Sequence, residues 1–389
     1  MNDTRARLDL TGLTTGPSQI WGGIRLVPLL RAEPVTDLRL HQQLYEGEYG
    51  SVRIHRDIHY TSYVPHGFVA HWTGDGSPAA AYGTQLGDPP PERMRLPRLR
   101  LAKRLDTDRL RFLPLHLALE GYLALHFGGP TIAWEHWSAQ ALRRGLSPRE
   151  EEAYAGTRVR GLADALRVFE IHPGQCGVLL YTADVLAAAF VVPHPDDYRA
   201  LHPSLLLDLY GELVHHYALL SAPVPDFRAD LGGSGIRTLA DLRAAAGRAD
   251  REWAAFHDTA MARDLLTAEY RLRTVHRMGR FTLGRFLPDF RPKQENHLGE
   301  TITDADGRVL YLKTFRLSEA QVRRGHLLDR LAAHDWHLPA AATALGLTEA
   351  ALGLRLANAG FGHLLRQDVL DHYRSRARRG GGAGHGLSR

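Results

Sequence analysis

The sequence predicts an α+β protein: an N-terminal body, β-rich and then mixed α/β, followed by a C-terminal module of three helices. Three patterns support this prediction. Two apolar runs, 177–181 and 185–192, flank a short turn, which is typical of a buried β-hairpin. A second hairpin is centred on the Asp-Gly turn at 304–307. Near the C-terminus, residues 338–361 carry two short helical patterns joined by a glycine, which is helix-turn-helix geometry.

The composition is that of an ordinary folded protein. The chain has 389 residues, of which 44% are hydrophobic and 23% charged, so two or three domains are expected. A net charge of +5 is compatible with nucleic-acid binding without requiring it. Cys176 is the single cysteine, which excludes an intramolecular disulfide and a cysteine zinc site. Because no signal peptide or membrane span is recognisable, we expect a cytoplasmic protein without a membrane partner.

The predicted body has three parts. Residues 1–95 are β-rich, with strands expected at 24–30, 51–63 and 68–72. Residues 96–232 read as mixed α/β. They contain the buried hairpin described above and helices expected at 111–127, 132–142 and 196–217.

The third part, 233–317, combines a long helical stretch at 238–276 with the Asp-Gly hairpin, and we expect it to pack on the rest of the body. From the end of the helical stretch onward, arginines and aromatic residues are interleaved over 271–286. This pattern fits either phosphate and base contacts or a solvated arginine face over buried rings.

Two polar clusters are candidate catalytic sites. Glu295, His297 and Glu300 precede and enter the second hairpin, and His194 and Asp196 follow a strand, where sites often lie. The sequence contains no P-loop, dinucleotide-binding, nucleophile-elbow or zinc-protease motif. The histidines do not share ligand faces in a convincing pattern. We therefore expect no metal site and no cofactor, and an enzyme is the second hypothesis rather than the first.

The C-terminal pattern gives each residue a local role. Pro339 suits the first turn of a helix, and Gly346 can adopt the left-handed conformation that ends it. Thr348 can then cap the next helix. Leu352 and Leu356 share one face of that second helix. The preceding stretch, 319–333, has an apolar stripe and would form the supporting first helix.

Residues 318–372 resemble the Fis-type helix-turn-helix family, which has an alanine-rich helix, the L-G-L-T turn at 345–348, and x-x-x-L-x-x-R-L ending at a glycine. The resemblance implies binding to DNA. The outward face of the second helix departs from a base-reading member, because it holds Glu349, Ala350, Gly353 and Ala357. The residues expected at DNA are Thr348, Arg355, Asn358, Arg323, Arg324 and Arg366.

The body and the tail complete the prediction. Stretches 18–30 and 169–192 resemble the protein domains associated with ADP-ribosylglycohydrolases and rhodanese-phosphatases, which implies a role near NAD or ADP-ribose metabolism. The Arg- and Gly-rich tail, 373–389, is expected to be disordered.

The first functional hypothesis is a DNA-binding regulatory or adaptor protein whose body senses an unknown small ligand or binds a protein partner. A homodimer is compatible with it. The alternatives are an enzyme acting on a nucleotide or ADP-ribose-like substrate, and a non-catalytic interaction scaffold.

Overall fold

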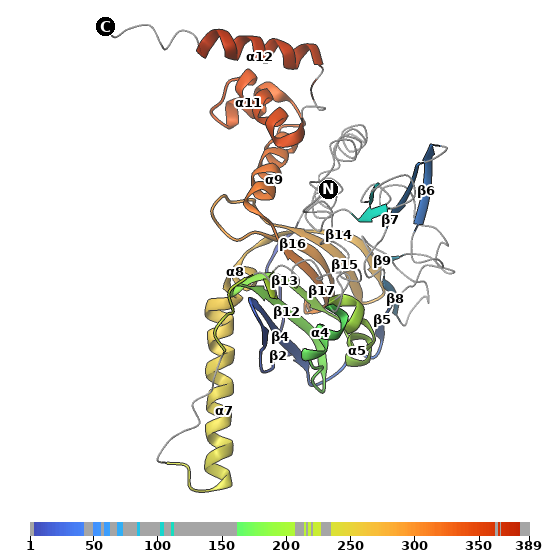
Figure 1. The fold of residues 1–389 in the computed structure, drawn as a ribbon, viewed down its shortest axis with the longest axis vertical. Helices are drawn as coiled ribbons and strands as arrows, with labels where there is room; N and C mark the ends of the chain where they lie inside the picture. Colours follow the sequence, from blue (N-terminus) through green and yellow to red (C-terminus); the bar gives the residue numbers. More distant parts are fainter. Residues whose placement is uncertain are drawn as a thin grey trace.

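The computed structural model describes most of the chain outside 86–161. The described residues are 4–42, 50–55, 58–62, 68–72, 84–85, 102–104, 110–112, 162–206, 214, 217–218, 221–226, 235–361, 365 and 367–381. Within them the fold is α+β, with a large antiparallel sheet and a separate group of C-terminal helices (Figure 1).

One ten-stranded sheet forms the body. Its order is β1-β14-β15-β16-β17-β13-β12-β4-β2, and β3 also pairs with β4. The strand pairs in this sheet are antiparallel. The strands are β1 (Thr4–Ala6), β2 (Leu13–Thr15), β3 (Gln19–Trp21), β4 (Ile24–Arg31), β12 (Gln175–Thr182), β13 (Val185–Val191), β14 (Tyr270–Met278), β15 (Phe281–Leu287), β16 (His297–Thr303) and β17 (Val309–Arg316).

Both faces of this sheet are buried. In β12, Val178 and Leu180 enter one apolar cluster, whereas Leu179 and Tyr181 enter the other, as alternation along a strand requires. The strand pairing confirms both predicted hairpins, β12–β13 and β16–β17. All four of these strands lie in the middle of the sheet. The β12–β13 turn places Ala183 and Asp184 at positive φ.

The first strands reach both outer edges of the sheet. Strand β1 pairs with β14 at one edge, and β2 pairs with β4 at the other. Between them, the Asp9 carbonyl accepts a hydrogen bond of 2.8 Å from the Val309 amide. Because only a short connection separates β1 from β2, the two edges lie within reach of each other, and the sheet must curl.

Smaller strands lie beside the body. They are β5 (Leu38–Gln42), β8 (Phe68–Trp72) and β9 (Thr84–Gln85) in one sheet, the hairpin of β6 (Gly50–His55) and β7 (Ile58–Ser62), and the pair β10 (Ala102–Arg104) and β11 (Leu110–Phe112). Strands expected at 24–30 and 68–72 are thus present, whereas the stretch expected as one strand at 51–63 holds two strands, β6 and β7, that pair with each other. The helix expected at 132–142, and most of the one at 111–127, lie outside the described residues. Residues 111–112 belong to β11.

The helices of the body are α4 (Leu162–Ala165), followed by a 3-10 turn at Leu166–Val168, then α5 (Pro195–Ser204), α7 (Leu239–Phe256) and α8 (Arg263–Thr267). The predicted helix at 238–276 is wrong at its end, because Tyr270–Met278 forms strand β14. The basic, aromatic stretch therefore belongs to the hairpin of β14 and β15. The buried rings of Tyr270 and Phe286 pack edge to face in it, with their centroids 4.8 Å apart.

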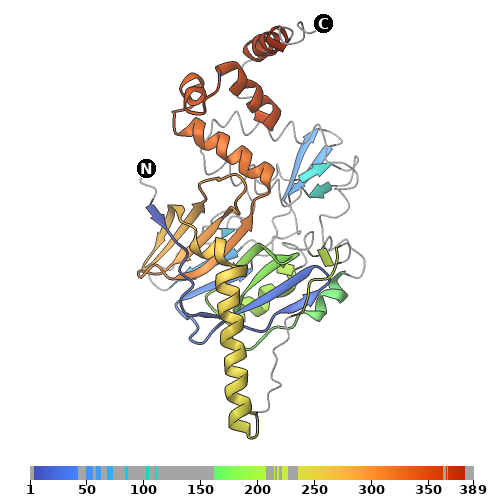
Figure 2. The same cartoon turned by 90° about the vertical axis from the view of Figure 1, so that its left-hand side faces the viewer.

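The C-terminal helices are α9 (Glu319–Ala332), α10 (Leu338–Ala344), α11 (Glu349–Leu356) and α12 (Gln367–Gly381), with a π-helical turn at Ala357–Phe361. They extend from one end of the body, and α7 extends from the opposite end (Figures 1 and 2). None of the described helices combines the length and apolar character needed to cross a membrane.

Helix α9 is fixed to the body. Gly325 lies so close to the Phe290 ring that a Cβ there would meet it at 2.3 Å. Beside this contact, Arg271 donates to the Asp329 carboxylate at 2.5 Å. The base of the C-terminal module is therefore part of the same packed structure as the sheet.

Candidate functional site

The first predicted polar cluster does not assemble. Strand β16 sends His297 toward the face that holds Leu186 and sends Glu300 to the opposite face, where Leu298 and Ile302 are buried. Glu295 lies before the strand and forms an ion pair of 3.5 Å with Arg316. These three side chains therefore do not converge on one side of the sheet, and nothing in their arrangement supports a shared catalytic role.

Each member of that cluster has a local environment of its own. Burial raises the pKa of Glu295. His297 is buried, its Nε2–H donates to the Leu186 carbonyl at 3.3 Å, and burial lowers its pKa to about 4. Glu300 is buried between two cross-strand cations, Arg285 and Lys313. It also accepts a hydrogen bond of 3.4 Å from the Tyr311 hydroxyl. This pattern is that of a cross-strand charge network.

The second predicted cluster is a helix cap. His194 is the N-cap of α5, and its Nδ1 accepts a hydrogen bond of 3.1 Å from the Asp196 amide. The Asp196 side chain is 74% exposed and lies 3.6 Å from the same nitrogen. This geometry explains the polar loop without chemistry, because a cap satisfies free amides of the first helical turn. No group of three or more potential metal ligands occurs among the described residues.

The helices expected near the C-terminus are present as α9, α10 and α11, with the predicted glycine turn between the last two. Gly346 has a φ of 64°, and the Thr348 hydroxyl accepts a hydrogen bond of 3.2 Å from the Ala351 amide, as predicted. The side chains buried between the three helices are those of Leu331, Ala341, Ala342, Leu352 and Leu356. The second helix continues through a π-helical turn to Phe361 rather than stopping at Gly360.

One predicted outward position of α11 is covered. A Cβ on Gly353 would meet the Tyr373 ring at 2.5 Å, and the Tyr373 hydroxyl donates to the Glu349 carboxylate. The tail expected to be disordered from residue 373 instead belongs to α12 as far as Gly381, and the remaining residues lie outside the described part. Leu370 and Tyr373 are both buried, so packing on α11 outweighs the polar composition of the tail.

The residues expected at DNA fall into different environments. Arg355 and Asn358 are exposed. Thr348 is also exposed, with its hydroxyl used as a cap. Arg323 is exposed and forms an ion pair of 3.2 Å with Glu319.

Arg324 is half-buried, and burial lowers its pKa. Arg366 lies outside the described residues.

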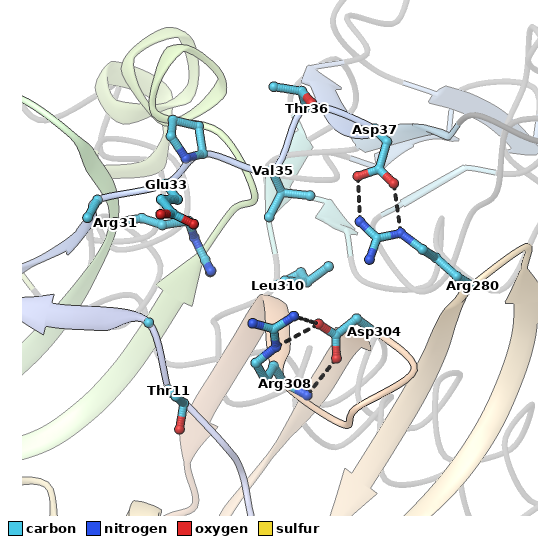
Figure 3. A pocket seen from close by; sticks show the side chains of 13 residues that line it. Thr11, Arg31, Glu33, Val35, Thr36, Asp37, Arg280, Asp304, Arg308 and Leu310 are labelled. Atoms are coloured by element: carbon cyan, nitrogen blue, oxygen red, sulfur yellow. Dashed lines mark hydrogen bonds and ion pairs between the residues drawn. The ribbon is translucent and has the colours of Figure 1, made fainter.

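A polar cavity at one end of the sheet was not predicted. It has a volume of about 400 Å³ and lies where β4 ends and where the β14–β15 and β16–β17 hairpins turn (Figure 3). Arg280 donates two hydrogen bonds, of 2.7 and 2.8 Å, to Asp37. Arg308 donates one of 2.9 Å to Asp304. A third arginine, Arg31, points into the cavity from the end of β4.

Two features of the sequence point weakly to this cavity. Arg31 ends an otherwise apolar strand, and Asp304 belongs to the predicted hairpin turn. Neither observation shows that the two positions meet. The cavity is built from segments almost 300 residues apart, including the turn at Gly12, and only the sheet order brings them together.

A protein-family model described as ARPP-2 matches residues 8–279, which is well over half of the chain. The chain belongs to the ARPP-2 family. Searches of curated proteins and of solved structures found no match. The ARPP-2 match includes Arg31 and Asp37 of the cavity and ends before β15, although β15, β16 and β17 are central strands of the same sheet. Helices α9–α12 also lie beyond the ARPP-2 match.

Proposed function

We propose that this ARPP-2 chain is a non-catalytic DNA-binding regulatory or adaptor protein, in which α9–α11 contact duplex DNA and the sheet body binds a ligand or partner. The observation that carries the proposal is the exposure of Arg355 and Asn358 on α11. Leu352 and Leu356 anchor this helix against its neighbours, and Gly353 contacts α12. Arg355 and Asn358 thus lie on the face that remains open.

The contact is expected to be with the DNA backbone rather than with base edges. In helix-turn-helix proteins the first turn of the second helix approaches the bases. Here that turn contains Glu349, which is acidic and accepts a hydrogen bond from Tyr373. An arginine and an asparagine in the second half of the helix suit phosphate oxygens. Binding should therefore depend little on sequence and strongly on salt.

The test is fluorescence anisotropy of the full chain with a short duplex of random sequence, at salt concentrations from about 50 to 200 mM. The double variant Arg355→Ala/Asn358→Ala should bind more weakly, with the salt dependence reduced by about one released counterion. Arg251→Ala is the matched control, because Arg251 is an exposed residue of α7, the helix that extends from the end of the body opposite to α9–α12 (Figure 1). Equal binding by both variants and the unchanged protein would remove α11 from the interface.

A second candidate is an interaction scaffold, and the cover of α12 over the first turn of α11 favours it. The Tyr373–Glu349 hydrogen bond and the close contact at Gly353 occupy a surface that a DNA-reading helix leaves open. Absence of DNA binding at the lowest salt, with an intact fold, would support the scaffold over the regulator. Sedimentation measurements would then test whether the partner is a second copy of the chain.

A further inference from the structure

The starting point is a buried cation in the cavity. Arg31 is only 7% exposed, and its Nη2 donates a hydrogen bond of 3.3 Å to the Val309 carbonyl. Its Nε is buried and has no hydrogen-bond partner. The Cys176 thiol and the Asp304 carboxylate interact with this guanidinium, but no carboxylate of the described residues is hydrogen-bonded to it, so its lost hydration is only partly replaced.

The other strong charges of the cavity already neutralise one another. Arg280 and Asp37 form a two-bond ion pair. Asp304 accepts from Arg308 and also from the amides of Asp306 and Arg308, at 3.0 and 2.9 Å. Within the described part of the chain, no carboxylate is hydrogen-bonded to Arg31. The remaining acid of the cavity, Glu33, is exposed and therefore solvated.

The size and charge of the cavity select the ligand class. A volume of about 400 Å³ is in the range of small-molecule sites. Three arginines and three acids line the cavity, so its formal charge is zero. A single negative charge can pair with Arg31, whereas the second charge of a dianion would meet arginines that already pair with Asp37 and Asp304. Val35 and Leu310 provide apolar wall beside these groups.

We propose that this cavity binds a small organic monoanion whose carboxylate pairs with Arg31 (Figure 3). A guanidinium edge offers parallel N–H groups that match the two oxygens of a carboxylate. The ligand's hydrocarbon part lies against Val35 and Leu310. This inference names a ligand for the body and does not depend on DNA binding by the helical module.

The experiment uses saturation-transfer NMR on the full chain with three probes: propionate, methyl phosphate and propylammonium. Transfer should be strongest to propionate. Arg31→Met removes the charge, and Ala32→Trp fills the cavity from an exposed position that lines it. Both should weaken propionate binding about tenfold or more. Arg251→Met and Ala244→Trp, at exposed positions on α7, are the matched controls and should bind propionate normally.

Each outcome decides the proposal. Loss of propionate transfer in Ala32→Trp supports it even if Arg31→Met fails to fold. No transfer in the unchanged protein, equal transfer in Ala32→Trp, or a preference for methyl phosphate or propylammonium would overturn it. DNA binding is measured on the same samples. A protein that binds propionate without binding DNA would contradict only the proposed function, and the reverse would contradict only the proposed ligand.

Discussion

In the sheet body, residues that are close in sequence point to opposite faces, whereas in the C-terminal module residues three or four apart share a face. Strand β16 separates His297 from Glu300 across the sheet. Helix α11 brings Leu352 and Leu356 into one cluster. A polar cluster read from the sequence is therefore weak evidence for a site in a strand, and a periodic apolar pattern is strong evidence for packing in a helix.

The two regions also differ in how a glycine joins one element to the next. Gly325 of α9 meets Phe290, which is fully buried in the body core. Gly353 of α11 meets Tyr373, which belongs to the last helix. The first contact is surrounded by packed structure, and the second has a helix on its outer side that can move away.

The largest expected effect is that of Gly325→Leu. The new side chain would collide with the Phe290 ring, which cannot move without disturbing the core, so the free energy of unfolding should fall by about 3 kcal/mol. Chemical denaturation measures this change. Gly247→Leu on α7 is the control, because its Cβ would meet only the Arg251 guanidinium, at 3.6 Å. Equal losses in the two variants would contradict the docking of α9.

The next effect is a pH dependence that belongs to the body. Burial lowers the pKa of His297 from its ordinary value of 6.5 to about 4. The unfolded chain therefore binds more protons than the folded chain in that interval, and stability is lost as the pH falls through it. His297 should contribute a loss of about 2 kcal/mol between about pH 7 and pH 5.

Replacing the group isolates its contribution. His297→Gln should flatten the fall in unfolding free energy with decreasing pH, whereas His372→Gln, at an exposed position of α12, should leave the slope unchanged. His202 is also buried with a pKa near 4, so part of the slope should persist in the first variant. A slope identical to that of the unchanged protein would show that His297 is not held neutral by burial.

A smaller effect is expected at Gly353→Ala. The added Cβ would push Tyr373 away, and hydrogen exchange in α12 should rise while the unfolding free energy falls by about 1 kcal/mol. Gly247→Ala on α7 should change stability in the opposite direction, by about 1 kcal/mol, because alanine favours an open helical position. Unchanged exchange in α12 would contradict its contact with α11.

The smallest effect is expected at the cap of α5. His194→Ala should cost about 0.5 kcal/mol, and His194→Asn should restore it, because asparagine also accepts from a first-turn amide. Thermal unfolding measures both variants. Rescue by asparagine would show that the cap hydrogen bond is what His194 contributes to stability, and no rescue would contradict the cap.

The parts of the structure that local sequence patterns determine could be predicted. The hairpins, the Gly346 turn and the Thr348 cap each follow from residues a few positions apart, and each is confirmed. The local pattern predicts helix over most of strand β14, because the burial of this strand depends on distant partners such as Phe286. The cavity around Arg31 was missed for the same reason, since the Asp304 turn lies far from it in sequence.

The N-terminal segment that reaches both sheet edges has a consequence for synthesis. Strand β1 is synthesised long before its partner β14, which begins at Tyr270. At typical elongation rates this strand waits on the order of tens of seconds for its partner. During that interval β1 lacks its partner strand and stays open to pairing with strands of other proteins. Chaperones that bind during translation should therefore concentrate on this segment.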